Sequence, residues 1–157
     1  MSLLAEYRDA RRDEDIARLR RAVALRAMVA TGMSQREIAS ALGISQPAVS
    51  QQLKASAAVD DAHPEVLLDA AAPILEGLAL DRGYLRLAVF GSVGRREATY
   101  DSDIDLIVEA PPGTSSFDFV RFQQVLERVL GREIDLVDYG GLKPGVDDDI
   151  LRDARLL

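Results

Sequence analysis

Two aspartates, Asp103 and Asp105, are separated by one residue and follow the pair Gly91-Ser92 after ten intervening residues. Because side chains alternate between the two faces of a strand, Asp103 and Asp105 are predicted to lie on the same face. Two carboxylates this close together repel each other unless cations lie between them. Hard oxygen ligands of this kind suit Mg²⁺, which also coordinates substrate phosphates. The spacing therefore predicts a metal site at the mouth of a strand.

The Gly91-Ser92 pair has the composition of a phosphate-binding turn, and it directly follows the apolar residues 85–90. Glycine lets the backbone come close to a phosphate, and a serine hydroxyl and the amides at a helix start can donate to its oxygens. Arg95 follows one turn later and could reach the same anion. Gly91, Ser92 and Arg95 are therefore the residues predicted to bind a phosphate-bearing ligand.

A third carboxylate, Asp135, has apolar neighbours on both sides in the segment 133–137. If this segment is a strand beside the one that carries Asp105, Asp135 joins the cluster. Two metals about 3.5–4 Å apart could then activate an attacking hydroxyl and stabilise a leaving pyrophosphate. An isolated pair of aspartates is usually a solvated strand end, so the prediction depends on the whole combination. Glu133 and Asp138 are nearby alternatives for the third position.

The apolar pattern around these residues switches between strand and helix periods. One helix is expected to begin at Pro64, since proline suits the first turn of a helix, and another to end at Gly131. The last expected helix has an acidic start, which is favourable to the helix dipole. The expected strands are 85–90, 104–108 and 133–138, the expected helices are 64–80, 117–130 and 147–155, and the inward-facing residues of the first of these helices are Val66, Leu67, Ala70, Ile74 and Leu78.

The N-terminal part of the chain is predicted to be all helical. Ser34 and Glu37 form a capping box, Gly43 makes a turn, and Ser45 can cap the following helix. Residues 54–63 are small and polar and are interpreted as a joint between two domains, 1–60 and 61–157. The expected helices are 14–31, 34–42 and 45–54, with Ile38, Leu42, Ile44, Val49 and Leu53 as a shared core.

The segment from Ser34 to Lys54 resembles a helix-turn-helix, the module that places its second helix in the major groove of DNA. Glutamine can bond adenine edges, and serine or lysine can bond phosphates. One such helix contacts only a half-site, so a dimer is expected. Docking of a protein is the alternative role, and the arginines of the first helix could reach phosphates or form a solvated face. The predicted DNA-contacting residues are Gln46, Pro47, Ser50, Gln51 and Lys54, and the first-helix arginines are Arg11, Arg12, Arg18, Arg20, Arg21 and Arg26.

The residues from Gly91 to Asp105 resemble the minimal nucleotidyltransferase family of the polymerase-beta-like superfamily, whose pattern is Gly-Ser, ten residues, Asp-x-Asp. Arginine three residues after the serine, and serine before the first aspartate, also match. The resemblance covers roughly residues 64–157. It implies an α/β (α+β) nucleotidyltransferase core with a short mixed sheet, which here is preceded by an all-α helix-turn-helix domain.

The resemblance also implies roles for single residues. Ser92 would contact the triphosphate of ATP, the donor, and Asp103 and Asp105 would hold two Mg²⁺ ions. Asp135 would be the third, activating carboxylate. The chain departs from the family pattern at two positions: Gly94 stands where alanine is common, and Arg96 where glycine is common. Neither departure removes a predicted ligand.

A core of this size resembles the antitoxins of toxin–antitoxin pairs, in which the minimal nucleotidyltransferase transfers AMP to a tyrosine of a helical toxin nuclease of the HEPN family. The first hypothesis is therefore a protein adenylyltransferase that binds DNA for autoregulation and forms a homodimer or a hetero-oligomer. A second is a transcriptional regulator that only senses nucleotide. A third is a stand-alone nucleotidyltransferase acting on a small molecule or on tRNA.

Composition and charge limit which of these hypotheses are possible. Residues 1–60 carry a net charge of +2 and residues 61–157 carry −9, which permits DNA contact in the first part and suits a carboxylate metal site in the second. Cysteine is absent, which excludes thiolate chemistry, and the single histidine, His63, is expected at the surface. No export signal or membrane span is expected, so the predicted location is the cytoplasm.

Overall fold

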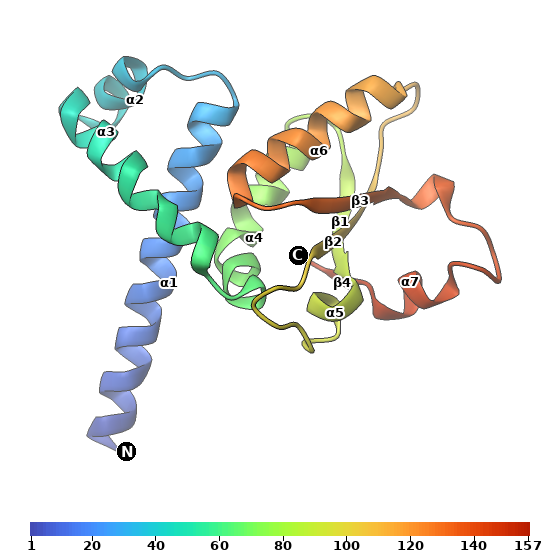
Figure 1. Ribbon diagram of the computed structural model, residues 1–157, viewed down its shortest axis with the longest axis horizontal. Helices are drawn as coiled ribbons and strands as arrows, with labels where there is room; N and C mark the ends of the chain where they lie inside the picture. Colours follow the sequence, from blue (N-terminus) through green and yellow to red (C-terminus); the bar gives the residue numbers. More distant parts are fainter.

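The computed structural model describes residues 1–157, and its centre is a four-stranded mixed sheet (Figure 1). The strands are β1 (Leu85–Phe90), β2 (Ile104–Glu109), β3 (Ile134–Asp138) and β4 (Arg155–Leu156), in the order β3-β2-β1-β4. Strand β1 is antiparallel to both β2 and β4, whereas β2 and β3 are parallel. The predicted mixed sheet is therefore confirmed.

The two faces of the sheet are covered by different parts of the chain. Helices α4 (Pro64–Leu80) and α6 (Ser116–Leu130) pack on one face, where Leu106 and Leu126 belong to the main core. The other face carries a smaller cluster that includes Phe90 and Ile107, and the C-terminal segment covers it. That segment contains the 3₁₀ turn η2 (Tyr139–Gly141) and helix α7 (Asp148–Asp153).

Side chains along β2 and β3 alternate between the two faces of the sheet, and this decides which of them pack against α4 and α6 and which against the C-terminal segment. Even-numbered residues such as Ile104 and Ile134 lie in the main core beneath α4 and α6. Odd-numbered residues such as Ile107 and Val137 lie on the opposite face, in or against the smaller cluster. By the period of two, Asp105 and Asp135 share that second face. The fold thus holds the carboxylates on the face opposite α4 and α6.

The N-terminal helices are α1 (Leu3–Ala30), α2 (Gln35–Leu42) and α3 (Gln46–Ala55). The capping box has formed: the Ser34 amide donates to Glu37 Oε2 at 2.8 Å, and the Glu37 amide donates to Ser34 Oγ at 3.1 Å. Gly43 takes a left-handed conformation with φ +68°, and the Ser45 hydroxyl accepts from the Ala48 amide. The buried residues beneath these helices are Leu25, Ile38, Ala39 and Val49, with Ile44 and Leu53 partly buried.

Two predicted core positions are wrong. Leu42 is 47% exposed because it is the last residue of α2, one turn beyond the small core around Ile38. Val66 is also 47% exposed, because it lies on the solvent side of α4, between the buried residues Pro64 and Leu67. The buried residues of α4 are Pro64, Leu67, Leu68, Ala70, Ala71, Leu75, Leu78 and Ala79.

The predicted joint is an ordered segment. It contains the 3₁₀ helix η1 (Ser56–Asp61), whose Val59 is fully buried in the main core. The Arg26 guanidinium donates to the Ser56 carbonyl at 2.8 Å and to Asp60 Oδ1 at 2.9 Å. From the other side, the Arg132 guanidinium donates to the Ala62 carbonyl at 2.8 Å. The domain boundary at residues 60 and 61 stays a prediction.

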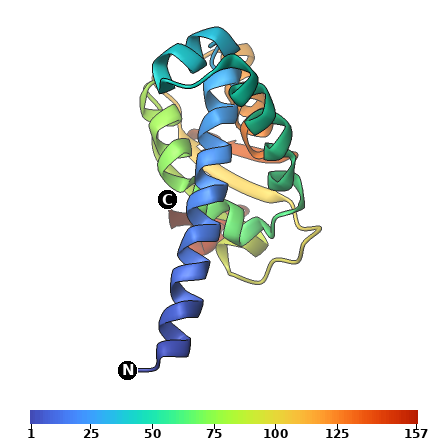
Figure 2. The ribbon, with the colours of Figure 1, turned by 90° about the vertical axis from the view of Figure 1, so that its left-hand side faces the viewer.

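Helix α1 is longer than predicted and serves both parts of the chain. Val23 and Ala27 contribute to the main core with α4 and α6, while Leu25 contributes to the small core with α2 and α3. The helix begins at Leu3, and its first half projects away from the rest of the molecule (Figures 1 and 2). None of the helices combines the length and the hydropathy that a membrane span requires.

The fourth strand was not expected from the sequence, because a strand of two residues has no measurable periodicity. It pairs with Ala88 and Val89 of β1, and it follows α7 directly. This return of the chain brings the carbonyl of Asp153 against Gly94. A Cβ atom on Gly94 would lie 2.9 Å from both the Asp153 and the Val89 carbonyl oxygens, so the position has no room for the alanine that is common there.

Gly94→Ala should lower the free energy of unfolding by about 1–3 kcal/mol, the usual cost of forcing a methyl group into a packed site. Gly77→Ala is the matched control, because Gly77 lies inside α4 with open space around it. That substitution should raise the free energy of unfolding by about 0.5–1 kcal/mol through helix propensity. Urea denaturation measures both changes. Equal stability of Gly94→Ala and the unsubstituted chain would contradict the packing of α7 on this turn.

Candidate active site

The turn after β1 brings Gly91 against the carboxylate of Asp105. Gly91 begins the short helix α5 (Gly91–Gly94) and has φ +65°, a conformation that L side chains rarely adopt. A Cβ atom at this position would also collide with the Asp105 side chain. Phe90 is the register partner of Asp105 across the antiparallel pair. Glycine is therefore required here by backbone conformation and by the close approach of a carboxylate.

Ser92 and Arg95 differ in how available they are to a ligand. Ser92 lies in the first turn of α5 and is half-exposed. Arg95 is engaged within the chain: its guanidinium donates to Asp153 Oδ2 at 2.9 Å and to Glu97 Oε2 at 3.2 Å. An anion at the turn would therefore compete with two carboxylates for Arg95.

The three predicted carboxylates lie at one end of the sheet. Asp105 on β2 is the register partner of Asp135 on the parallel strand β3, and Asp103 lies just before β2. Burial raises the pKa of Asp105, and the negative charges of Asp135 and Asp103 raise it further, while the positive charge of Arg95 lowers it. Asp103 and Asp135 are exposed and Asp105 is half-buried. The three carboxylates thus form a negatively charged cluster that is accessible to solvent.

Carboxylate oxygens, the donor atoms available here, are ligands that a hard divalent cation prefers. No group of three or more acidic or histidine side chains in the chain converges closely enough to form a complete metal cage. Mg²⁺ in phosphate-transfer sites typically uses one or two carboxylates together with substrate phosphates and waters, rather than a cage made only of protein. Asp105, which lies against Gly91, and the exposed Asp103 just before β2 fit that pattern, and their role as ligands stays a prediction.

The two departures from the family pattern have structural explanations. Gly94 is required by the approach of the Asp153 carbonyl, as described above. Arg96 has φ +57°, a left-handed conformation that explains why glycine is common at this position. The Arg96 side chain points to Asp69 on α4, with 3.4 Å between guanidinium and carboxylate.

His63 was expected at the surface, and this expectation is wrong. Its Nδ1 accepts from the Glu65 amide at 3.2 Å and thereby caps α4, so the neutral ring carries its proton on Nε2, 3.1 Å from the Ala98 carbonyl. The ring also packs edge-on against Tyr100, with centroids 4.9 Å apart. His63 therefore connects α4 to the loop between the Gly91-Ser92 turn and Asp103. The signal in the sequence was its place just before Pro64, the first residue of the helix.

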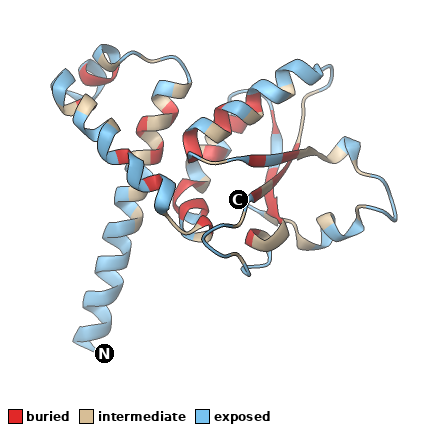
Figure 3. Ribbon diagram, in the orientation of Figure 1, coloured by how far each residue is buried: buried red, intermediate tan, exposed pale blue.

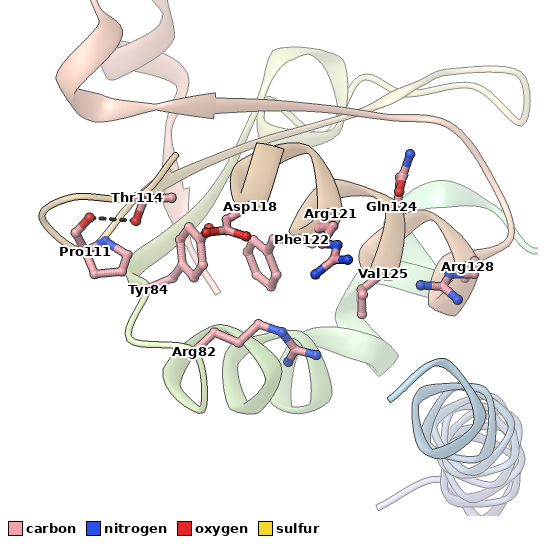
Figure 4. A pocket seen from close by; sticks show the side chains of 10 residues that line it. All are labelled: Arg82, Tyr84, Pro111, Thr114, Asp118, Arg121, Phe122, Gln124, Val125 and Arg128. Atoms are coloured by element: carbon pink, nitrogen blue, oxygen red, sulfur yellow. Dashed lines mark hydrogen bonds between the residues drawn. The ribbon is translucent and has the colours of Figure 1, made fainter. Parts of the chain in front are cut away.

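A cavity of about 560 Å³ lies elsewhere, between α4 and α6 (Figure 4). Tyr84, just before β1, and Pro111, just after β2, belong to its lining, so it is at the opposite end of the strands from Phe90 and Asp105. It shares no residue with the carboxylate cluster. The predicted site therefore lies outside this cavity.

The predicted DNA-contacting residues are on one helix and face outward. Gln46, Pro47, Gln51 and Lys54 are exposed on α3, and Ser50 is half-buried. The first-helix arginines are divided in their roles. Arg26 is held by η1 and Arg20 donates to the Ala70 carbonyl at 3.4 Å, so these two support the structure. Arg18 pairs with Glu14 on its own helix, and the exposed members are Arg11, Arg12, Arg18, Arg20 and Arg21.

Comparisons with known proteins agree with this geometry. The model of a family described as a nucleotidyltransferase domain matches residues 75–157. A Methanocaldococcus jannaschii protein named as a candidate protein adenylyltransferase is 42% identical over 77 residues, which are 49% of this chain and 83% of that protein. The protein adenylyltransferase MntA of Thermococcus cleftensis is 38% identical over 72 residues, 46% of this chain and 73% of that protein.

A solved structure gives the same result for the fold. It is described as that of a candidate minimal nucleotidyltransferase and superposes with a TM-score of 0.54 at 38% sequence identity. The match covers 59% of this chain and 95% of the other. The family match begins at residue 75, inside α4, so helices α1, α2 and α3 lie outside it.

Asp105→Asn should raise the free energy of unfolding at pH 7 by up to about 1 kcal/mol when divalent cations are chelated, because it removes a half-buried charge together with its solvent-screened repulsion from Asp135 and Asp103. The folded state raises the pKa of Asp105, so ionisation of this group opposes folding. The gain is therefore present above that raised pKa and disappears as pH falls below the ordinary value of 3.8. Urea denaturation across this pH range measures it.

The control for this experiment is Asp101→Asn, a substitution of an exposed turn residue just before the cluster. It should leave the free energy of unfolding at pH 7 unchanged. Addition of Mg²⁺ should raise the melting temperature of the unsubstituted chain and not that of Asp105→Asn. A loss of stability in Asp105→Asn under chelation would contradict the repulsive cluster.

Proposed function

The chain belongs to the nucleotidyltransferase domain family, and from this premise we propose that it transfers AMP from ATP to a hydroxyl group of a partner protein. The observation that carries the proposal is the open carboxylate cluster of Asp103, Asp105 and Asp135 beside the Gly91-Ser92 turn. Relatives named as protein adenylyltransferases support the choice of a protein as acceptor. The enzyme class is that of a nucleotidyltransferase.

The chemistry is an in-line displacement at the α-phosphorus of ATP. The acceptor oxygen forms a bond to the α-phosphorus while the bond from that phosphorus to the bridging oxygen breaks, and pyrophosphate leaves. Asp135 takes the proton of the acceptor hydroxyl, and its exposure on β3 suits a group that must meet a partner's side chain. The Ser92 hydroxyl and the amides of the turn hold the triphosphate.

Mg²⁺ is the proposed cofactor, with Asp103 and Asp105 as its protein ligands. When bound, it would neutralise charge on the triphosphate and on the leaving pyrophosphate. The raised pKa of Asp105 fits this role, because a nearby cation would favour the ionised form that burial and the charges of Asp135 and Asp103 disfavour. Arg95 would exchange its contact with Asp153 for a phosphate oxygen when the substrate binds.

The proposed acceptor is a tyrosine of a helical toxin of the HEPN type, for which this chain would be the antitoxin. The site supports an acceptor of this size because the carboxylates face solvent instead of lining a closed cavity. A small-molecule acceptor would need walls on more sides than this open face supplies. The partner would therefore form the second wall of the active site.

We further propose that α2 and α3 form a helix-turn-helix that binds DNA near the chain's own coding region. The capped helices, the left-handed Gly43 and the outward-facing Gln46, Gln51 and Lys54 support this reading. The chain's net negative charge lies in the catalytic part, so it does not prevent the N-terminal helices from approaching phosphates. Binding as a dimer would engage two half-sites and repress the operon that encodes both partners.

The transferase proposal is tested with the purified partner and ATP labelled at the α-phosphate. Asp103→Ala, Asp105→Asn and Asp135→Asn should each lower label transfer by at least about 100-fold, because each removes several kcal/mol of transition-state stabilisation. Transfer should also require Mg²⁺. Mass spectrometry of the partner should find an added AMP on a tyrosine.

Asp138→Asn is the matched control, because Asp138 lies at the far end of β3 and caps Gly140 with an oxygen that asparagine keeps. It should retain full transfer. Unchanged transfer in Asp135→Asn would refute the role of this carboxylate. ATP-dependent DNA affinity without any covalent product would identify a nucleotide sensor instead of a transferase.

The DNA-binding proposal is tested on duplex DNA from upstream of the coding region and on a scrambled duplex. Gln51→Ala should weaken binding to the specific duplex by about 1–3 kcal/mol and leave the scrambled duplex unaffected, since a base contact is lost. Lys54→Ala should weaken both and reduce the salt slope by about 1. Gln124→Ala removes an exposed amide on α6 and should change neither affinity. If all these variants bound both duplexes as tightly as the unsubstituted chain, α3 would be excluded as the recognition helix.

A further inference from the structure

The first half of α1 is a helix without a partner. Residues 1–15 are all exposed, and the helix stands clear of the body of the molecule (Figures 2 and 3). Its exposed apolar residues are large: Leu3 is 78% exposed, Leu4 58% and Tyr7 66%. A helical segment of about 12–15 residues is marginal in water without tertiary packing. A surface that covers this segment is therefore expected.

One face of α1 has the residue spacing of a helix-pairing seam. Its members follow one another at intervals of four and three residues, which keeps them on one side of the helix. Apolar residues stand at its two ends and charged residues in the middle. The seam consists of Leu4, Arg8, Arg11, Asp15, Arg18 and Ala22.

An apolar groove of about 320 Å³ opens on the same face of α1. Asp15, Arg18 and Ala22 of the seam line it, and Leu19 stands beside them. Its remaining wall comes from η1 and from the starts and ends of neighbouring helices, with Val59 and the exposed Val66 among the residues. The exposed Val66, which the core of its own chain does not cover, is thus part of an apolar receiving surface.

The seam is self-complementary in an antiparallel pair of α1 helices whose two-fold axis passes at Asp13. Leu4 and Ala22 lie nine residues on either side of Asp13, and Tyr7 and Leu19 lie six residues on either side. In an antiparallel pair of α1 helices, Leu4 and Tyr7 of the free half would therefore face Ala22 and Leu19 of the groove half. Arg11 and Asp15 lie two residues on either side and would form two symmetric ion pairs.

The charges of the seam allow this pairing. Residues 1–20 carry five basic and five acidic side chains, so two copies of the segment have no net repulsion. Arg8 and Arg18 would face each other, but Arg18 already has Glu14 at 3.3 Å and Asp15 at 3.6 Å on its own helix. The like charge is thus compensated before the copies meet.

We propose that two copies of this chain pair through antiparallel α1 helices, with Leu4 and Tyr7 of each copy seated in the apolar groove of the other. A two-fold axis makes every contact occur twice, as in an isologous dimer. If the proposed DNA binding also holds, the pairing sets its geometry. The two Leu25 residues, on which α2 and α3 pack, would lie roughly 36 Å apart along the helix axis, close to one turn of DNA.

Sedimentation equilibrium of the full chain tests the pairing without DNA or a toxin. The unsubstituted chain should be a dimer at micromolar concentration. Arg11→Asp and Asp15→Arg should each weaken the dimer by at least about tenfold, because each places like charges opposite one another. The double variant Arg11→Asp with Asp15→Arg should restore dimerisation, since the ion pairs are regenerated in reverse. Circular dichroism would verify that each variant keeps its helices.

Control substitutions on α6 distinguish pairing through this seam from non-specific association. Leu4→Ser should weaken the dimer, whereas Val120→Ser, at a similarly exposed residue on α6, should not. Arg128→Asp, a charge reversal on α6, should also leave the dimer intact. A monomer at 100-fold higher concentration, or a double variant as weak as the single ones, would overturn the proposal. Failure of DNA binding in a chain that still dimerises would count only against the proposed helix-turn-helix function.

Discussion

The parallel pairing of β2 with β3 is the constraint on which the candidate site depends. Its register places Asp105 opposite Asp135, and the alternation of side chains turns both away from α4 and α6. A shift of one residue would turn either carboxylate into the apolar core, where ionisation would be costly. The apolar residues between the acids, Ile104 and Ile134 among them, hold that register by filling the main core.

The same pairing accounts for the electrostatics of the site. Burial and then the negative charges of Asp135 and Asp103 raise the pKa of Asp105, and the folded chain tolerates this because Asp103 and Asp135 are exposed to solvent. Gly91 completes the arrangement, since any side chain there would displace the Asp105 carboxylate. An unfavourable cluster that is maintained by strong packing beneath it is what a cation-dependent site requires. Stability and chemistry thus use opposite faces of the same two strands.

Much of this arrangement could be predicted from the sequence because its signals are local. Strand periods around Asp105 and Asp135, the capping box at Ser34 and the turn at Gly43 depend on residues a few positions apart. The three expected strands and the helices from Gln35 onward agree with the expected ones to within a few residues, whereas α1 begins eleven residues earlier than expected; the mixed sheet is confirmed. The roles of the single site residues stay predictions that the geometry supports.

What the sequence could not reveal depends on contacts between distant segments. Strand β4 exists only because residues 155–156 return to β1, and the need for Gly94 follows from that return. His63 looked like a surface residue because its partner, the Ala98 carbonyl, is 35 positions away. The exposure of Leu42 and Val66 likewise reflects where neighbouring elements end, which no periodicity encodes.

The clamped 3₁₀ segment η1 has a consequence for how this chain can evolve. Val59 is part of the core under the sheet, and Arg26 and Arg132 fasten the segment from opposite sides. Helix α1 gives alternate side chains, Val23 and Leu25, to two different cores. The N-terminal helices therefore share hydrophobic core with the rest of the chain. Exchanging α1 for another helix would remove Val23 and Ala27 from the core beneath the sheet, so a replacement would have to supply apolar side chains at the same places.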